Sequence, residues 1–253
     1  MQPPDVEHIY CDGRIYDRQH ESFMQDLPFW QRLAATHGGP ILELACGTGR
    51  VAIPLAQDGH QVTGLDAAET MLREARRKSS ALGVRVEWIH GDMRAFDLDG
   101  RCFQLITIPF NALCHLYEPE EMEAFLGCVR RHLGPEGRFV IDVFNPKLQY
   151  LVRDPDEPFG HAEFEDPEGR GRVTVTERCS YDRATQINHI TVTYHHGWSG
   201  EEISDLLRMR IYYPRELDLW LRQSGLCILE KLGDNDQSPF TTESPKQLVI
   251  CGR

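Results

Sequence analysis

The stretch ILELACGTGRVA, residues 41–52, contains the pattern that decides the fold. Its mostly apolar beginning predicts a buried strand, yet the carboxylate of Glu43 lies inside it. Gly47 and Gly49 follow at once, and glycine lets a backbone turn tightly and approach a ligand closely. In an open parallel sheet, ligands bind beyond the carboxyl ends of the strands. We therefore predict a first strand that ends in a ligand-binding turn.

Apolar runs alternate with helical patterns over residues 40–145. The expected strands cover 40–45, 60–66, 84–92, 103–110 and 138–145, and the expected helices cover 49–59, 67–83 and 119–137. This alternation predicts βαβ units and a parallel sheet that is covered on both faces.

The hydrophobic period changes to two between residues 161 and 212, which predicts antiparallel strands. A helix is expected over 214–225, followed by two more strands. We therefore predict an α/β fold with a Rossmann-like seven-stranded sheet, formed by residues 40–145 and 213–253. A small antiparallel β-insertion after strand five, residues 146–212, and an N-terminal helical lid, residues 1–39, complete the expected organisation.

The net charge, the apolar stretches and the cysteines limit the partners, the location and the metal sites that we expect. The formal net charge is −12, whereas a nucleic-acid surface needs clustered Lys and Arg, so no nucleic-acid partner is expected. No apolar stretch is long enough to span a membrane, and the polar, acidic start has no signal-peptide core, so the expected location is the cytoplasm. The eight cysteines are scattered without a C-x-x-C pair, which predicts reduced thiols and no metal site.

The glycine turn fits two classes of cofactor. GTGRVA, residues 47–52, formally satisfies the dinucleotide fingerprint, and Asp66 stands at the end of the second strand. A pyrophosphate does not benefit from an acid just before the turn, but a cationic ligand does. S-adenosylmethionine carries a sulfonium and an ammonium and no phosphate, so Glu43 favours this cofactor.

Four segments together resemble the class I S-adenosylmethionine-dependent methyltransferases. ELACGTGRVAIPLA resembles motif I, E/D-x-G-x-G-x-G, with Ala45 in place of the first glycine. VTGLDAAETML (62–72) resembles motif II, HGDMRAFDL (90–98) the adenine-binding segment, and FQLITIPFNALCHL (103–116) motif IV. The family often has an acid where this chain has Gln104.

The resemblance implies a set of cofactor contacts. Asp66 would accept the two ribose hydroxyls, Asp92 the adenine amino group, and the Met93 amide would face a ring nitrogen. The implied S-adenosylmethionine-binding residues are Tyr16, Glu43, Ala45, Gly47, Gly49, Asp66, Ala67, Met71, Gly91, Asp92, Met93, Pro109, Phe110 and Asn111.

The rest of the chain resembles small-molecule methyltransferases with an antiparallel insert, such as sugar N,N-dimethyltransferases and glycine N-methyltransferases. Methyl transfer from a sulfonium is an in-line displacement, in which a general base helps when the acceptor arrives protonated. The catalytic candidates are His115, Tyr213 and Tyr16. Weaker candidates, for which a surface or packing role is the alternative, are His195, His196, Arg208 and Arg210.

We therefore expect an enzyme (EC 2.1.1.-) that methylates N or O of a small-molecule acceptor and acts as a monomer or homodimer. The alternatives are a tRNA or protein methyltransferase and a non-catalytic cofactor-binding subunit. An NAD-dependent enzyme is the remaining possibility for the glycine turn.

Overall fold

The central sheet of the computed structural model, which describes residues 7–253, has seven strands in the order β10-β11-β5-β4-β1-β2-β3. The strands are β1 (Ile41–Leu44), β2 (Val62–Asp66), β3 (Glu87–His90), β4 (Phe103–Ile108), β5 (Leu133–Phe144), β10 (Cys227–Leu232) and β11 (Lys246–Gly252). β1 to β5 pair in parallel, whereas β11 is antiparallel to both of its neighbours. The predicted seven-stranded α/β sheet is confirmed, with an antiparallel edge.

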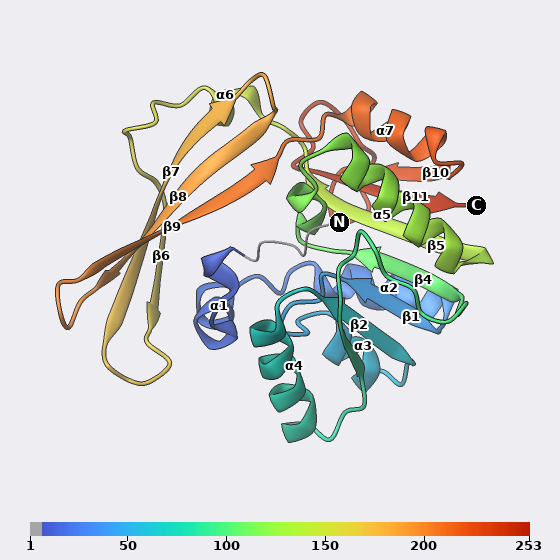
Figure 1. The fold of residues 1–253 in the computed structure, drawn as a ribbon, viewed down its shortest axis with the longest axis horizontal. Coiled ribbons are helices and arrows are strands. Elements are labelled where there is room, and N and C mark those ends of the chain that lie inside the picture. The colour runs from blue at the N-terminus through green and yellow to red at the C-terminus, as the bar shows by residue number, and fades with distance from the viewer. Residues whose placement is uncertain (1–6) are drawn as a thin grey trace.

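Helices cover both faces of this sheet (Figure 1). α5 (Pro119–His132) and α7 (Pro214–Gln223) share one apolar cluster with Leu42 and Leu44. α2 (Leu27–His37) and α3 (Ala52–Gln57) share the other with Ile41, while α4 (Glu69–Ala81) packs beside β2 and β3. Because side chains alternate along a strand, Glu43 lies on the face of Ile41, and it is only 3% exposed.

A second sheet stands beside the first (Figure 1). Its strands β6 (Phe159–Glu165), β7 (Arg172–Asp182), β8 (Ile187–His196) and β9 (Glu202–Arg210) are antiparallel, and the short helix α6 (Leu148–Leu151) precedes them. We call β6–β9 the insert sheet. Its alternating apolar residues form a small core against which Ile9 and Ile15 pack.

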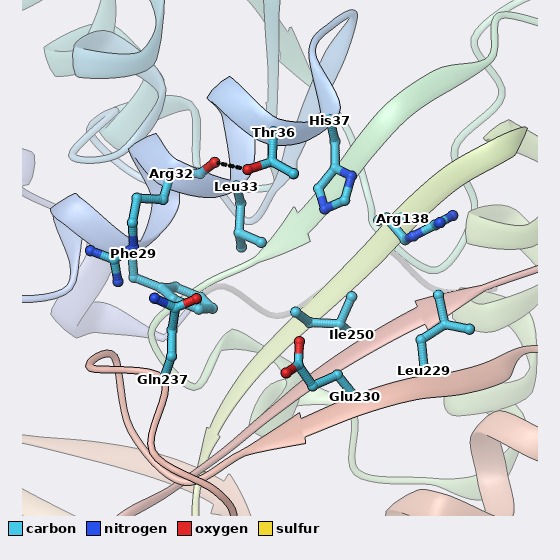
Figure 2. Close-up of a pocket in the computed structure, with 10 residues that line it drawn as sticks. All are labelled: Phe29, Arg32, Leu33, Thr36, His37, Arg138, Leu229, Glu230, Gln237 and Ile250. Atoms are coloured by element: carbon cyan, nitrogen blue, oxygen red, sulfur yellow. Dashed lines mark hydrogen bonds between the residues drawn. The ribbon is translucent and has the colours of Figure 1, made fainter.

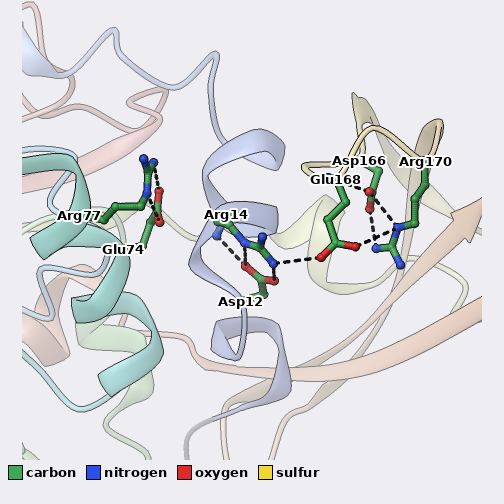
Figure 3. A network of polar contacts seen from close by, with 7 residues as sticks. All are labelled: Asp12, Arg14, Glu74, Arg77, Asp166, Glu168 and Arg170. Atoms are coloured by element: carbon green, nitrogen blue, oxygen red, sulfur yellow. Dashed lines mark hydrogen bonds and ion pairs between the residues drawn. The ribbon is translucent and has the colours of Figure 1, made fainter. Parts of the chain in front are cut away.

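Helix α1 (Gly13–Gln19) lies between the two sheets. Arg14 on this helix forms ion pairs with Asp12, the N-cap residue, and with Glu168 in the turn between β6 and β7 (Figure 3). On the other side, Asp17 accepts hydrogen bonds from Thr48 and Lys78 of the central domain. The N-terminal segment therefore joins the insert sheet to the glycine turn. The domain boundaries and the role of this segment as a lid stay predictions, and residues 1–6 lie outside the described residues.

Two helix boundaries differ from the prediction by three residues or more. The helix expected over 119–137 ends at His132, and β5 begins already at Leu133, which pairs with Phe103. Gly134 and Pro135 do not favour a helix, so pairing with β4 determines the backbone there. Helix α3 begins at Ala52 rather than at Gly49, because Gly49 has a positive φ of 80°.

All eight cysteines are free thiols, of which Cys11, Cys102 and Cys227 are exposed. Within residues 7–253, no helix combines the length and the apolar character needed to cross a membrane.

Candidate active site

Asp66 fixes the turn that follows β1. Its Oδ2 accepts the backbone N–H of Gly47 at 2.7 Å, and its Oδ1 accepts that of Ala68 at 2.8 Å. Burial raises the pKa of this carboxyl, and these hydrogen bonds partly offset the effect. A carboxylate has about four acceptor positions, so lone pairs remain for a ligand hydroxyl at this edge.

Gly47 and Gly49 both have left-handed backbone, with φ of 55° and 80°. A Cβ added at Gly49 would stand 2.6 Å from the Trp88 ring, so only glycine fits there. Packing against Trp88 therefore requires glycine at position 49, and a close contact of this turn with a ligand stays a prediction.

Ala45 occupies the first glycine position of the motif, and its φ is 52°. This left-handed conformation costs an L-residue with a Cβ about 1–2 kcal/mol. The substitution of glycine by alanine in this chain is thus a local source of strain beside the turn.

Replacing Ala45 with glycine is expected to raise the free energy of unfolding by about 0.5–1 kcal/mol, since the released strain exceeds the added entropy of the unfolded chain. Urea unfolding measures the change. Ala124→Gly in the middle of α5 is the matched control, and it should destabilise by about 1 kcal/mol. Equal losses in both variants would show that Ala45 is unstrained.

Glu43 is buried without a complete set of partners. Its Oε2 is inaccessible and has no hydrogen-bond partner in the described part of the chain, and burial raises the pKa of this carboxyl to about 8. Arg50 lowers that pKa in part, but its guanidinium already pairs with Asp26 at 2.5 and 2.8 Å. A cationic group bound at the turn would therefore stabilise the ionised form of Glu43.

The ends of β2 and β3 converge on the same region. The Gly91 N–H donates to the Asp66 carbonyl at 2.9 Å, and the carbonyl of Ala67 lies 2.9 Å from Nε2 of His90. Met71 is 2% exposed, and its Cε would lie 3.5 Å from a Cβ built at Gly47. The structure thus brings these residues together around Asp66.

Asp92 has a partner that the sequence analysis missed. Arg94 donates to both of its carboxylate oxygens, at 2.7 to 3.0 Å, and also pairs with Glu121 of α5. Met93 lies between these residues and packs against the core. The expected contacts of Asp92 and Met93 with adenine stay predictions.

The loop after β4 is fixed by buried polar contacts. Pro109 is followed by Phe110 and Asn111, both with positive φ, 56° and 62°. The Phe110 N–H donates to Asp142 Oδ2 at 3.1 Å, and Asn111 Oδ1 accepts the N–H of Phe144 at 2.7 Å. Strained residues held in this way often lie at functional sites.

Aromatic rings from the N-terminal segment cover this loop. The Tyr16 ring centroid lies 4.2 Å from His20 and 5.9 Å from Tyr10, and His20 and Phe23 each lie 5.6 Å from Phe110. Burial raises the pKa of Tyr16, so its hydroxyl remains protonated. Two segments far apart in sequence therefore form one aromatic surface beside the turn.

His115 lies at the end of the 3₁₀ helix η2 (Ala112–His115), next to this surface. Its Nε2 is 2.8 Å from the Tyr10 hydroxyl, and its Nδ1 is 3.3 Å from the Tyr117 hydroxyl and 3.9 Å from Oε2 of Glu7. Burial, with a smaller contribution from Arg208, lowers the pKa of His115 to about 4. The imidazole is therefore neutral at physiological pH.

Other catalytic candidates lie toward the insert sheet. The Tyr213 hydroxyl is 3.5 Å from that of Tyr181 on β7, and Tyr213 precedes α7. His195 lies between Thr176 and Glu202 on the insert sheet, and His196 packs edge-on against Trp198. The catalytic role of Tyr213 stays a prediction.

The two weaker arginine candidates differ. Arg208 reaches the His115 network through Glu7, whereas Arg210 pairs with Glu216 at the start of α7. Sequence reasoning missed Glu7 and Tyr10 because their partners are more than 100 residues away in the chain. The cluster of polar and aromatic residues at 7–20 was the available signal.

A cavity of about 380 Å³ lies elsewhere, between α2 and strands β5, β10 and β11 (Figure 2). None of the predicted site residues lines it. A second cavity, of about 310 Å³, separates α1 from the insert sheet and includes His196 in its lining.

Comparison with known proteins finds methyltransferases. The family model described as "Methyltransferase domain" matches residues 41–137. The CcbJ methyltransferase structure from Streptomyces caelestis superimposes with a TM-score of 0.77 at 28% identity, over 90% of this chain and 94% of that one. A dTDP-3-amino-3,6-dideoxy-alpha-D-glucopyranose N,N-dimethyltransferase from Streptomyces fradiae is 27% identical, covering 72% of this chain and 80% of the relative. The cypemycin N-terminal methyltransferase from Streptomyces is 28% identical, covering 85% and 84%.

Residues 41–137 thus match a methyltransferase domain, and the structural neighbours of the chain are class I S-adenosylmethionine-dependent methyltransferases. Its relatives include N,N-dimethyltransferases of amino sugars from Streptomyces.

The residues present fit the cofactor. The partnerless oxygen of Glu43 suits its ammonium group, and the remaining lone pairs of Asp66 suit the ribose.

Proposed function

We propose that this methyltransferase transfers the methyl group to an amine nitrogen of a small molecule, with a hydroxyl oxygen as the alternative acceptor. The observation that carries the proposal is the neutral, half-buried imidazole of His115 beside the aromatic surface of Tyr10 and Tyr16. S-adenosylmethionine supplies a methyl group on a good leaving group. The protein must therefore mainly align the acceptor, exclude water and take up a proton.

The names of the relatives support nitrogen over oxygen. Those from Streptomyces fradiae and Streptomyces venezuelae are N,N-dimethyltransferases of amino sugars, and the cypemycin enzyme is an N-terminal methyltransferase. A tRNA acceptor and a non-catalytic role gain no support from the family match or from the sugar-modifying relatives. We extend the proposal to a cytoplasmic enzyme whose N-terminal segment and insert sheet shape the acceptor site.

Paired acceptors test the proposal. Each amine, such as a 3-amino sugar, is offered with the hydroxyl compound of the same skeleton, and S-adenosylhomocysteine is measured with product mass. We expect turnover with at least one amine and less than a tenth of that rate with its hydroxyl partner. Turnover of hydroxyl compounds alone would show that oxygen is the acceptor atom. No turnover with either set would contradict the proposed function.

His115→Ala is expected to lower kcat with the amine about 100-fold, because general base catalysis contributes about 10²- to 10⁴-fold. The dissociation constant for S-adenosylmethionine, measured by calorimetry, should change less than threefold. His60→Ala, in the loop before β2, is the control and should retain activity. An unchanged kcat in His115→Ala would show that this residue has no role in the reaction.

A further inference from the structure

Glu7 has a buried carboxylate oxygen without a partner in the described residues. The Glu7 side chain is only 6% exposed, and its Oε2 has no hydrogen-bond partner among residues 7–253. Leaving a buried acceptor unsatisfied costs about 1–3 kcal/mol, and more when the group is charged. Oε1 of the same carboxylate, by contrast, accepts the backbone N–H of Arg208 at 2.9 Å and lies 3.2 Å from the Tyr117 hydroxyl. The carboxylate is therefore held firmly by one oxygen while the other lacks a partner.

The partnerless oxygen faces His115. Oε2 lies 3.9 Å from Nδ1 of the imidazole, while the opposite ring nitrogen, Nε2, lies 2.8 Å from the Tyr10 hydroxyl. Glu7 and Tyr10 come from the N-terminal segment, Tyr117 follows η2, and Arg208 lies on β9. These four residues are the charged or titratable groups that face His115 in the contacts described for residues 7–253.

The hydrogen bonds favour one tautomer of His115. The Tyr117 hydroxyl has one proton and lies 3.2 Å from Oε1 of Glu7 and 3.1 Å from the Arg208 carbonyl. When its proton goes to one of these acceptors, a lone pair of Tyr117 faces Nδ1 of His115. In this arrangement Nδ1 carries the proton, and Nε2 accepts from the Tyr10 hydroxyl.

From this geometry we propose that Glu7 is a positioning residue, which orients His115 and stabilises it once Nε2 has taken a proton through Tyr10. The inference rests on the proposed function, because it needs an acceptor that loses a proton. After proton uptake, the imidazolium Nδ1–H has a carboxylate oxygen beside it that previously had no partner. In other pairs of a nucleophile and a general base, a third group likewise orients the base.

Methyl transfer to the amine releases one proton, which passes to His115 through Tyr10. The amine nitrogen forms a bond to the transferred methyl carbon as the bond between that carbon and sulfur breaks, and its electron pair stays on sulfur. One N–H bond of the amine breaks and its proton goes to the Tyr10 oxygen, while the Tyr10 proton goes to Nε2 of His115. His115 later returns this proton to solvent.

Glu7→Gln tests the inference, because it keeps the size of the side chain and removes its charge. The first measurement is made on the protein without cofactor, by ¹⁵N NMR of the imidazole nitrogens, with the His115 signals assigned by their loss in His115→Gln. We expect wild-type His115 to carry its proton on Nδ1, and Glu7→Gln to weaken that preference and lower the pKa of His115. A wild-type proton on Nε2 would overturn the inference.

The second measurement is kinetic. With an amine that the wild type methylates, Glu7→Gln should lower kcat about 10- to 50-fold, leave KM and S-adenosylmethionine binding within about threefold, and move the acidic limb of the pH profile to lower pH. Glu168→Gln, whose carboxylate is exposed in the turn after β6, is the matched control. If KM rose and cofactor affinity fell by as large a factor as kcat, Glu7 would have a purely structural role and the inference would be wrong. Failure of the wild type to methylate any amine would instead contradict the proposed function.

Discussion

Asp66→Asn is expected to weaken S-adenosylmethionine binding at least 100-fold, which is the largest loss at the cofactor turn. Both oxygens of Asp66 accept backbone N–H groups, of Gly47 and Ala68. The NH₂ group of asparagine would face one of these donors, so the turn would lose an anchor as well as its charge. Hydrogen bonds to a charged group contribute about 1.5–3 kcal/mol each. The loss of two such bonds therefore lowers the affinity 100-fold or more.

Titration calorimetry measures this effect, and Asp58→Asn is the control. Asp58 follows α3, where it accepts a hydrogen bond from the Gln31 side chain on the exposed surface. Its substitution should leave cofactor affinity within twofold. A loss of less than tenfold in Asp66→Asn would show that the carboxylate supports the fold but not the ribose.

Much of the central sheet could be predicted because its signals are local. The apolar run of β1, the two glycines and the acid at the end of β2 lie within residues 41–66, and parallel strands bring their carboxyl ends to one edge. For the same reason the structure places Glu43, Gly47 and Asp66 together. The alternation does not determine the order of the seven strands, because doubly wound sheets with different strand orders share it.

Contacts between distant segments could not be predicted. Glu7 meets His115 only because the N-terminal segment crosses the end of β4, and the polar and aromatic residues at 7–20 do not indicate this partner. Arg94 likewise finds Glu121 on a helix that follows the next strand. The strain at Ala45 was also missed, since the sequence shows a small residue but not its backbone angle.

Glu43→Gln is expected to change stability and cofactor binding in opposite directions. Burial raises the pKa of Glu43 to about 8, whereas the carboxyl has its ordinary value of 4.5 when the chain is unfolded. Between these two pH values the folded state holds a proton that the unfolded state has lost, so stability without cofactor falls as pH rises from about 4.5 to about 8. By this linkage the ionised carboxylate costs the folded state a few kcal/mol, about 3–5, above pH 8.

Glutamine removes this cost but also the anion that we expect to face the ammonium of the cofactor. At pH 8.5 the Tm of cofactor-free Glu43→Gln should exceed that of the wild type by several degrees, whereas at pH 5 the two should be nearly equal. S-adenosylmethionine affinity should fall about 10- to 100-fold, as expected for the loss of a partly buried ion pair. Glu74→Gln is the matched control with the opposite sign, because Arg77 holds the pKa of Glu74 below its ordinary value.

Proton release distinguishes this explanation from a simple loss of packing. If the cofactor ammonium ionises Glu43, binding at pH 7 must release up to one proton from the wild type, and the calorimetric enthalpy must then depend on the ionisation enthalpy of the buffer. Glu43→Gln should bind without that dependence. A wild type that binds S-adenosylmethionine with the same enthalpy in phosphate and in Tris would mean that Glu43 is already ionised, or stays neutral, at the turn. The preference for a cationic ligand, from which the cofactor was first inferred, would then need another origin.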